Sequence, residues 1–200
     1  IAISELGGFA EYACVSEDLL VLKPANSPVE AAAAVPTAAL TALQGLRDKG
    51  QIQPGQKVLI NGASGGVGTF AVQLARYFGA EVTGVCSMRN LDMVRSIGAD
   101  HVIDYTQEDF TNTGQHYDLI YCAVGNRSIS DYMRALTPQG RCVIAGFTSL
   151  RLMFAYTILG PRRSKVGGQQ VGPMGTVKPN KEDLMFMKEL LEAGNVKPVI

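Results

Sequence analysis

The chain has 200 residues, with 18 basic and 18 acidic side chains and a formal net charge of +0 at pH 7. This balance excludes a global field that recruits nucleic acid or an anionic membrane, so any anion site must be local. The length suits one full domain with some additional chain. Twenty-two glycines and only 18% charged residues are typical of tightly wound nucleotide-binding folds.

The four cysteines, at positions 14, 86, 122 and 142, form no CxxC pair and have no histidine at metal-ligand spacing. We therefore expect buried or half-buried free thiols, as in a reducing compartment, rather than disulfides or metal ligands. The longest helix-like apolar stretch, residues 31–43, is shorter than the ~20 residues that span a bilayer, and no signal-peptide pattern is present. These features predict a soluble, cytoplasmic protein without membrane or nucleic-acid partners.

The first 23 residues alternate apolar and polar positions, which predicts short strands that end at Pro24. An alanine-rich helix is expected next, with Ser27 as its N-cap, a bend near Pro36 and a continuation to Leu46. The chain starts without Met and stops at KPVI after a predicted helix, so we expect both ends to be cut.

Downstream, the periodicity switches repeatedly between strand and helix. The predicted strands are 57–61, 81–86, 101–104, 117–122 and 141–145, and the predicted helices are 69–78, 90–97, 130–136 and 181–192, the last capped by Asn180. Alternation at this spacing predicts an α/β fold, a Rossmann-type doubly wound parallel sheet with helices on both faces. A ligand is expected beyond the carboxyl ends of the strands.

Residues 160–180 are rich in Gly, Pro, Lys and Arg and have no strong helical period. They predict either a mobile loop or an irregular edge strand, and VGGQQVGPMG could extend the sheet edge. The RRSK segment at 162–165 is either solvated surface or a second phosphate clamp.

The most informative segment is VLINGASGGVG, residues 58–68, where an apolar strand leads into a glycine-rich turn and then an amphipathic helix. Ala63, Gly65 and Gly68 occupy the three places of a GxGxxG pattern, so the match is the variant AxGxxG. A purely structural turn is the alternative. The preceding strand and following helix favour nucleotide binding, with a pyrophosphate at the helix N-terminus.

The residues at the end of the second predicted strand indicate which form of the adenosine ribose the site binds. An NAD site places an acid about 20 residues beyond the turn, but no carboxylate lies between Val82 and Asn90. Ser87, Arg89 and Asn90 can instead bind an adenosine 2′-phosphate, which predicts NADPH, unless Arg89 is only a solvent-facing residue. The missing acid also argues against S-adenosylmethionine. Methyltransferases generally bind the ribose of that cofactor with an acidic residue at this position.

Five motifs in fixed order carry a resemblance to a known family: PTAALTAL at 36–43, VLINGASGGVG at 58–68, AVQLAR at 71–76, VTGVCS at 82–87 and GADHVIDY at 98–105. Together they resemble the medium-chain dehydrogenase/reductase superfamily, in its zinc-free quinone oxidoreductase-like branch. The resemblance implies that residues 1–24 are the C-terminal remnant of a GroES-like catalytic β domain. It implies an NADP-binding Rossmann domain over 25–194 and a return toward the catalytic domain from 195–200.

The resemblance also bears on metal. Zinc alcohol dehydrogenases of the superfamily carry a cysteine ligand at the position that Thr37 occupies here, so a catalytic metal is not expected. Whether a structural zinc lobe exists upstream of residue 1 stays open.

The cofactor contacts implied by the resemblance fall on matching positions. They comprise a position near the nicotinamide, the pyrophosphate turn, the 2′-phosphate pocket and the cleft lining after the fourth and fifth strands. The residues are Thr41, Ala63, Ser64, Gly65, Gly66, Val67, Gly68, Ser87, Arg89, Asn90, Tyr105, Gly125, Gly146 and Phe147.

Several of these positions have a structural alternative. Thr41 could be an internally bonded helix residue, Tyr105 a surface tyrosine and Phe147 a core cap, while Gly125 and Gly146 could serve only turn geometry. No catalytic acid, base or proton donor can be named, and the two histidines are expected to be structural or exposed.

The resulting prediction is an NADPH-dependent oxidoreductase that transfers hydride to a quinone or an α,β-unsaturated carbonyl without metal. The alternatives are a zinc-type alcohol dehydrogenase and a non-catalytic NADPH-binding module. The exact small-molecule substrate cannot be read from the chain. The resemblance also implies a homodimer, paired through the sheet edge near residues 169–174.

Overall fold

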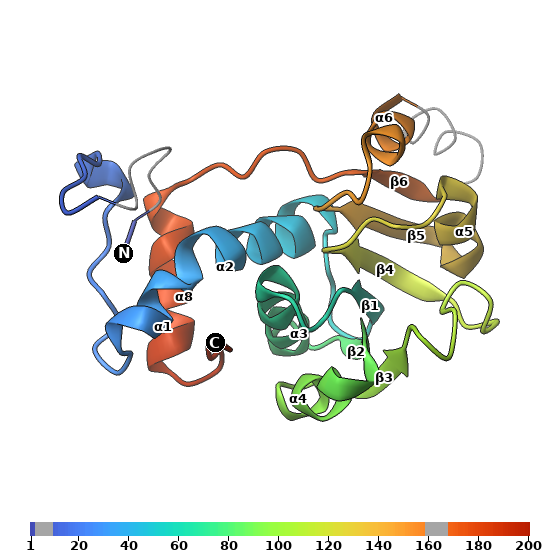
Figure 1. Cartoon of the computed structure of the whole chain (residues 1–200), viewed down its shortest axis with the longest axis horizontal. Helices are drawn as coiled ribbons and strands as arrows, with labels where there is room; N and C mark the ends of the chain where they lie inside the picture. The colour runs from blue at the N-terminus through green and yellow to red at the C-terminus, as the bar shows by residue number, and fades with distance from the viewer. Residues whose placement is uncertain (3–9, 159–167) are drawn as a thin grey trace.

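A computed structural model of the chain describes residues 1–2, 10–158 and 168–200. Its centre is a six-stranded sheet in the order β3-β2-β1-β4-β5-β6, and every neighbouring pair is parallel (Figure 1). The strands are Lys57–Asn61 (β1), Glu81–Cys86 (β2), His101–Asp104 (β3), Tyr117–Cys122 (β4), Leu136–Ile144 (β5) and Gln170–Pro173 (β6). The predicted doubly wound parallel sheet is therefore confirmed.

Helices cover both faces of the sheet. One face packs against α2 (Val35–Gln44), α3 (Gly66–Tyr77), α4 (Leu91–Ser96) and α8 (Lys181–Glu192), and the other against α5 (Ile129–Ala135) and α6 (Leu150–Ile158). Four of the five residues of β1 are buried, as are five of the six in β2, because a parallel sheet between two helical layers has no solvated face. No helix within the described residues has the length and apolar character needed to cross a bilayer.

The strand predictions for β1 to β4 match the structure residue for residue, whereas the other elements differ at their ends. Helix α3 begins three residues before the predicted start, and β5 begins at Leu136, directly after α5. Helix α6 was not predicted. Its large apolar residues Leu150, Phe154 and Ile158 are exposed, so the sequence there lacks the pattern of a helix with one buried stripe.

The N-terminal predictions need correction. Pro28, not Ser27, occupies the N-cap of α1 (Val29–Ala33), and no side chain caps that helix. Helix α2 then starts separately at Val35. In the described part of residues 1–23, an antiparallel bridge between Ala2 and Leu20 and a short 3₁₀ turn, Glu17–Leu19, stand in place of the predicted strands. The domain boundary at residue 24 stays a prediction.

For residues 160–180 the sequence left a mobile loop and an irregular edge strand as alternatives. Residues 170–173 form the edge strand β6, while the RRSK segment lies outside the described residues. The Asn180 cap is confirmed, since its side chain accepts a hydrogen bond from Asp183 N at 2.8 Å. Cys86, Cys122 and Cys142 are free and buried as predicted, but Cys14 is exposed because its segment does not pack into the sheet.

Candidate functional site

The glycine-rich turn leads directly from β1 into α3. Gly62 adopts φ 87°, and its carbonyl accepts a hydrogen bond from Gly65 N at 3.1 Å, which closes the turn. The first helical backbone bond runs from Thr69 N to Gly65 O at 2.8 Å. The N–H groups of Gly66, Val67 and Gly68 precede it, so they have no intrahelical acceptor and, with the helix dipole, form an anion site.

The space around the glycines fits a pyrophosphate at this turn. A Cβ on Gly68 would lie 2.0 Å from Gly62 O, so this glycine permits the close packing of the turn on the helix. A Cβ on Gly66 would meet nothing within 4 Å, and one on Gly65 would touch only Gly62 O at 3.5 Å. The backbone is therefore exposed where a phosphate would approach it.

Ala63 and Ser64 have different positions in the same turn. Ala63 is fully buried and donates its backbone N–H to Val85 O at 3.0 Å, so it anchors the turn to β2, and its contact with a cofactor stays a prediction. Ser64 is half-buried and lines the cleft described next.

A cleft of about 410 Å³ lies beside the turn, at the carboxyl ends of the central strands. It occupies the point where strand order reverses between β1 and β4, which is where open α/β sheets bind ligands. Its lining residues are Asn61, Gly62, Ser64, Gly65, Val85, Cys86, Tyr105, Val124 and Asn126.

The predicted 2′-phosphate residues gather at the end of β2. Asn90 donates from Nδ2 to Ser87 Oγ at 3.2 Å, and its backbone N–H donates to Ser87 O at 2.9 Å. The exposed Arg89 lies between them in the 3₁₀ turn Met88–Asn90 and makes no ion pair with the described residues. Tyr105, 56% exposed, lines the neighbouring cleft from the end of β3.

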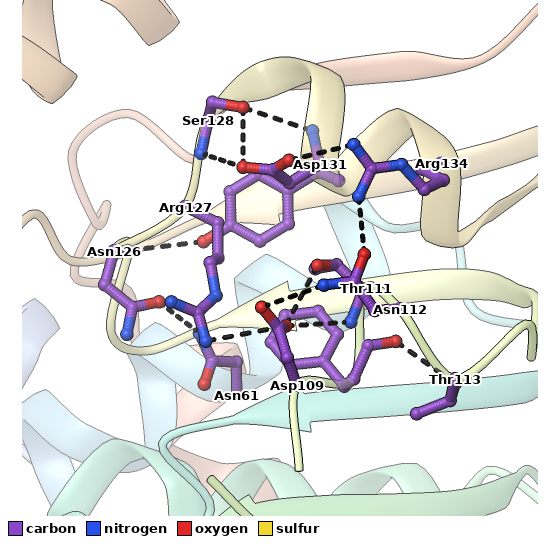
Figure 2. Close-up of polar contacts among 12 residues, drawn as sticks. Asn61, Asp109, Thr111, Asn112, Thr113, Asn126, Arg127, Ser128, Asp131 and Arg134 are labelled. Carbon is purple, nitrogen blue, oxygen red and sulfur yellow. Dashed lines mark hydrogen bonds and ion pairs between the residues drawn. The ribbon is translucent and has the colours of Figure 1, made fainter. Parts of the chain in front are cut away.

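A polar network holds together the loops that follow β3 and β4 (Figure 2). Arg127 Nη2 lies 3.4 Å from Asp109 Oδ1, and Arg134 Nη1 donates to Asn112 Oδ1 at 2.8 Å. Ser128 and Asp131 form a capping box at the start of α5, and their hydrogen bonds lower the pKa of the Asp131 carboxyl. The network therefore fixes the loop that carries Asn126 to the rim of the cleft.

Comparison with known proteins places this architecture in a family. A family profile described as "Zinc-binding dehydrogenase" matches residues 66–180. The chain belongs to this zinc-binding dehydrogenase family. The predicted membership in the medium-chain dehydrogenase/reductase superfamily, with quinone oxidoreductase-like character, is confirmed.

Three relatives illustrate the likeness. A chloroplast envelope quinone oxidoreductase homolog from Arabidopsis thaliana is 37% identical over 97% of this chain and 60% of its own length. An Arabidopsis NADPH-dependent alkenal/one oxidoreductase is 33% identical over 98% of this chain and 46% of its own. A quinone oxidoreductase structure from Coxiella burnetii aligns with a TM-score of 0.78 and 29% identity, covering 94% of this chain and 57% of that chain. The chain thus spans about half the length of these relatives.

Gly125, Gly146 and Phe147 lie outside the lining of the cleft. Gly125 N donates to Gly146 O at 2.8 Å, and a Cβ on Gly125 would lie 2.5 Å from that oxygen. A Cβ on Gly146 would lie 2.3 Å from Ala123 O. Both glycines therefore allow the ends of β4 and β5 to pack closely. Phe147 stacks on Tyr156 with ring centroids 6.0 Å apart and is 40% exposed.

Thr41 lies on α2 and is also outside the cleft lining. Its hydroxyl donates to Thr37 O at 2.6 Å, and its carbonyl accepts from the buried Tyr121 hydroxyl at 3.1 Å. Burial raises the pKa of Tyr121, so the phenol remains a donor at neutral pH. The structure thus fits the internally bonded alternative for the Thr41 side chain, and a role near the nicotinamide stays a prediction.

Sequence reasoning missed six of the cleft residues: Asn61, Gly62, Val85, Cys86, Val124 and Asn126. Asn61 and Cys86 are the last residues of β1 and β2, and Asn126 follows β4. The rule that ligands bind at strand carboxyl ends was therefore a sufficient signal for them. Burial and the nearby Asp104 raise the pKa of the Cys86 thiol, which lines the cleft as a neutral group.

Proposed function

We propose that this chain forms the nucleotide-binding half of a reductase that uses NADPH to reduce a quinone or an α,β-unsaturated carbonyl without metal. The observation that carries the proposal is the pair of sites at the ends of β1 and β2. Three unpaired backbone N–H groups follow β1, and an acid-free segment with an unpaired Arg89 follows β2. The first suits a pyrophosphate, and the second suits a 2′-phosphate.

The bound dinucleotide supplies the hydride, and the chain's own residues bind and orient it. The backbone of residues 66–68 would hold the pyrophosphate. Arg89 would neutralise the 2′-phosphate, to which Ser87 and Asn90 would donate hydrogen bonds, and Tyr105 would cover the adenosine side of the cleft. In this orientation the reacting end of the cofactor would extend toward the carboxyl ends of β4 and β5.

The acceptor class is supported by Thr37 and by the relatives' names. Thr37 stands where the superfamily's zinc enzymes carry a cysteine ligand, and without a metal to polarise it, an acceptor must delocalise charge itself. Quinones and α,β-unsaturated carbonyls meet that demand. One relative is named a quinone oxidoreductase homolog and another an NADPH-dependent alkenal/one oxidoreductase.

Calorimetric titration of the chain with NADPH and NADH tests the cofactor. We expect NADPH to bind at least about tenfold more tightly, and equal or tighter binding of NADH overturns the assignment. For the whole protein, we expect turnover of quinones or enones with NADPH in metal-free buffer. Stoichiometric zinc that is required for activity, or cofactor binding without turnover of any acceptor, contradicts the proposal. Residues 1–200 alone should turn over poorly.

We propose, in addition, a homodimer paired through β6 and residence in a reducing compartment, with the cytoplasm as the first expectation. Strand β6 is the edge of the described sheet, which is where the family resemblance implies pairing with a second copy. Cys122 and Cys142 are free thiols that share a hydrogen bond, with their sulfur atoms 3.9 Å apart, and the free state suits reducing conditions. Sedimentation and localisation of a tagged protein test the two proposals.

A further inference from the structure

The side chain of Asn61 ends in an amide at the base of the cleft. Asn61 is 5% exposed, and its Nδ2 donates to Val124 O at 2.7 Å. The same nitrogen donates to Asn126 Oδ1 at 3.2 Å (Figure 2). These two bonds use both hydrogens of the amide nitrogen and therefore fix the orientation of the amide. Its oxygen, Oδ1, accepts no hydrogen bond from the described residues, and Asn61 lines the cleft.

The side-chain amide of Asn126 lies next to the amide of Asn61. Its Oδ1 is engaged by Asn61, whereas its Nδ2 donates to none of the described residues, and the exposed side chain lies at the rim of the same cleft. The cleft therefore presents one fixed amide acceptor and one adjacent amide donor.

The proposed 2′-phosphate site determines which part of the cofactor faces this pair. Ser87, Arg89 and Asn90 lie at the end of β2, and the pyrophosphate turn lies at the end of β1. The adenosine ribose must therefore lie between these sites, and its base must enter the adjoining cleft. Val85, Cys86 and Val124 provide apolar surface there, beside Tyr105, which suits the flat faces of a purine.

We propose that Asn61 and Asn126 read the base as adenine. An amide oxygen accepts from the N6 amino group of adenine, and an amide N–H donates to a ring nitrogen, the pairing by which asparagine recognises adenine elsewhere. Asn61 Oδ1 supplies the acceptor and Asn126 Nδ2 the donor. A base with a carbonyl at C6 sets its oxygen against Asn61 Oδ1, and the amide cannot turn over without losing Val124 O and Asn126 Oδ1.

This inference rests on the proposed NADPH function, and a matched pair of nucleotides separates the two. NADPH and its hypoxanthine analogue differ only in the base, where a carbonyl replaces the N6 amino group. Titration of the unmodified chain is expected to give a dissociation constant at least about tenfold higher for the analogue. Equal affinities overturn the adenine inference while leaving the cofactor assignment intact. Failure of both nucleotides to bind overturns the proposed function and the inference with it.

Variants of Asn61 and Asn126 test whether these two side chains cause the preference for adenine over hypoxanthine. Asn61→Leu is expected to bring the two dissociation constants within about twofold of each other. Because this variant also loses the bond to Val124 O, Asn126→Ala gives a second measurement at an exposed position, where at least a threefold (~0.7 kcal/mol) loss of preference is expected. Asn195→Ala, at an exposed position outside both the cleft and the polar network, should change neither constant. An unchanged preference in Asn126→Ala, or in a folded Asn61→Leu variant, contradicts the assignment.

Discussion

The side-chain amide of Gln73 binds the backbone of Lys197 in both directions. Its Oε1 accepts from Lys197 N at 2.8 Å, and its Nε2 donates to Lys197 O at 2.9 Å. Gln44 binds Lys178 in the same way, at 3.0 and 2.7 Å. Both glutamines are 7% exposed. Each therefore gives an extended segment the two hydrogen bonds that a neighbouring strand would supply, and together they hold the segments that flank α8.

We expect Gln73→Leu to lower the free energy of unfolding by about 1–3 kcal/mol, because leucine keeps the volume but leaves the Lys197 backbone groups without partners. Urea denaturation measures the change. Gln107→Leu, at an exposed position, should stay within about 0.5 kcal/mol of the unmodified chain. A loss at Gln73 no larger than that at Gln107 would contradict the role given to this contact.

Alanine substitutions at two glycines of the turn should have different effects, one on the stability of the fold and the other on cofactor affinity. Gly68→Ala places a methyl group 2.0 Å from Gly62 O and is expected to destabilise the fold by about 1–3 kcal/mol or more. Gly66→Ala meets no atom within 4 Å, so its stability should be unchanged or raised by up to about 1 kcal/mol. Its methyl group nevertheless fills the space of the pyrophosphate, and NADPH affinity should fall at least about tenfold. Thermal unfolding and calorimetric titration of the same two samples provide both readouts.

Arg89→Ala should weaken NADPH at least about tenfold, because hydrogen bonds to a charged group are worth roughly 1.5–3 kcal/mol. NADH lacks the 2′-phosphate, so its dissociation constant should change less than about twofold. Arg95→Ala, which removes an exposed arginine of α4 that pairs with Asp92, serves as the charge-matched control. Equal losses for the two cofactors, or equal losses in the two variants, count against the 2′-phosphate contact.

Asp183 should make stability depend on pH. Burial alone would raise the pKa of this carboxyl, but hydrogen bonds from Arg47, Asn180 and Gln44 together lower it below its ordinary value of 3.8. The folded state then binds fewer protons than the unfolded state. The stabilisation is therefore complete above about pH 4 and is lost as the pH falls through the lower native pKa.

Urea denaturation between pH 2.5 and 6 (a range of about one to two units on either side of the reference pKa) measures this dependence. Asp183→Asn should flatten the curve, whereas Asp92→Asn, whose side chain is 99% exposed, should leave it nearly unchanged. A curve with the same slope in both variants contradicts the assignment to Asp183.

The central part of the fold could be predicted from the sequence because the apolar pattern of each segment agrees with its place in the buried sheet. Strands β1 to β4 are short apolar runs bounded by glycine or charged residues, and their ends were placed correctly. Helix α6 escaped prediction because Leu150, Phe154 and Ile158 are exposed and give no buried stripe. Ser27 resembled a helix cap, but the backbone enters α1 through Pro28, and a local motif cannot report that choice.

The candidate site was predicted in part. The turn at 63–68 was found by spacing, and its free backbone N–H groups follow from where α3 begins. Gly125 and Gly146, assigned to the cofactor by resemblance, also let β4 and β5 approach, which only three-dimensional packing reveals, and their cofactor role stays a prediction. Asn61 and Asn126 lie 65 positions apart in the chain and meet only because β1 and β4 are neighbours.

The strand order also determines when the cleft can exist during synthesis. The chain makes β1, β2 and β3 first, and these strands with the glycine-rich turn can assemble on one side of β1. Val124 and Asn126 arrive only with β4, on the other side. A nascent chain therefore passes through a stage that has a phosphate turn but no pocket for the base. Cofactor can stabilise the folding protein fully only once β4 has emerged and joined the sheet.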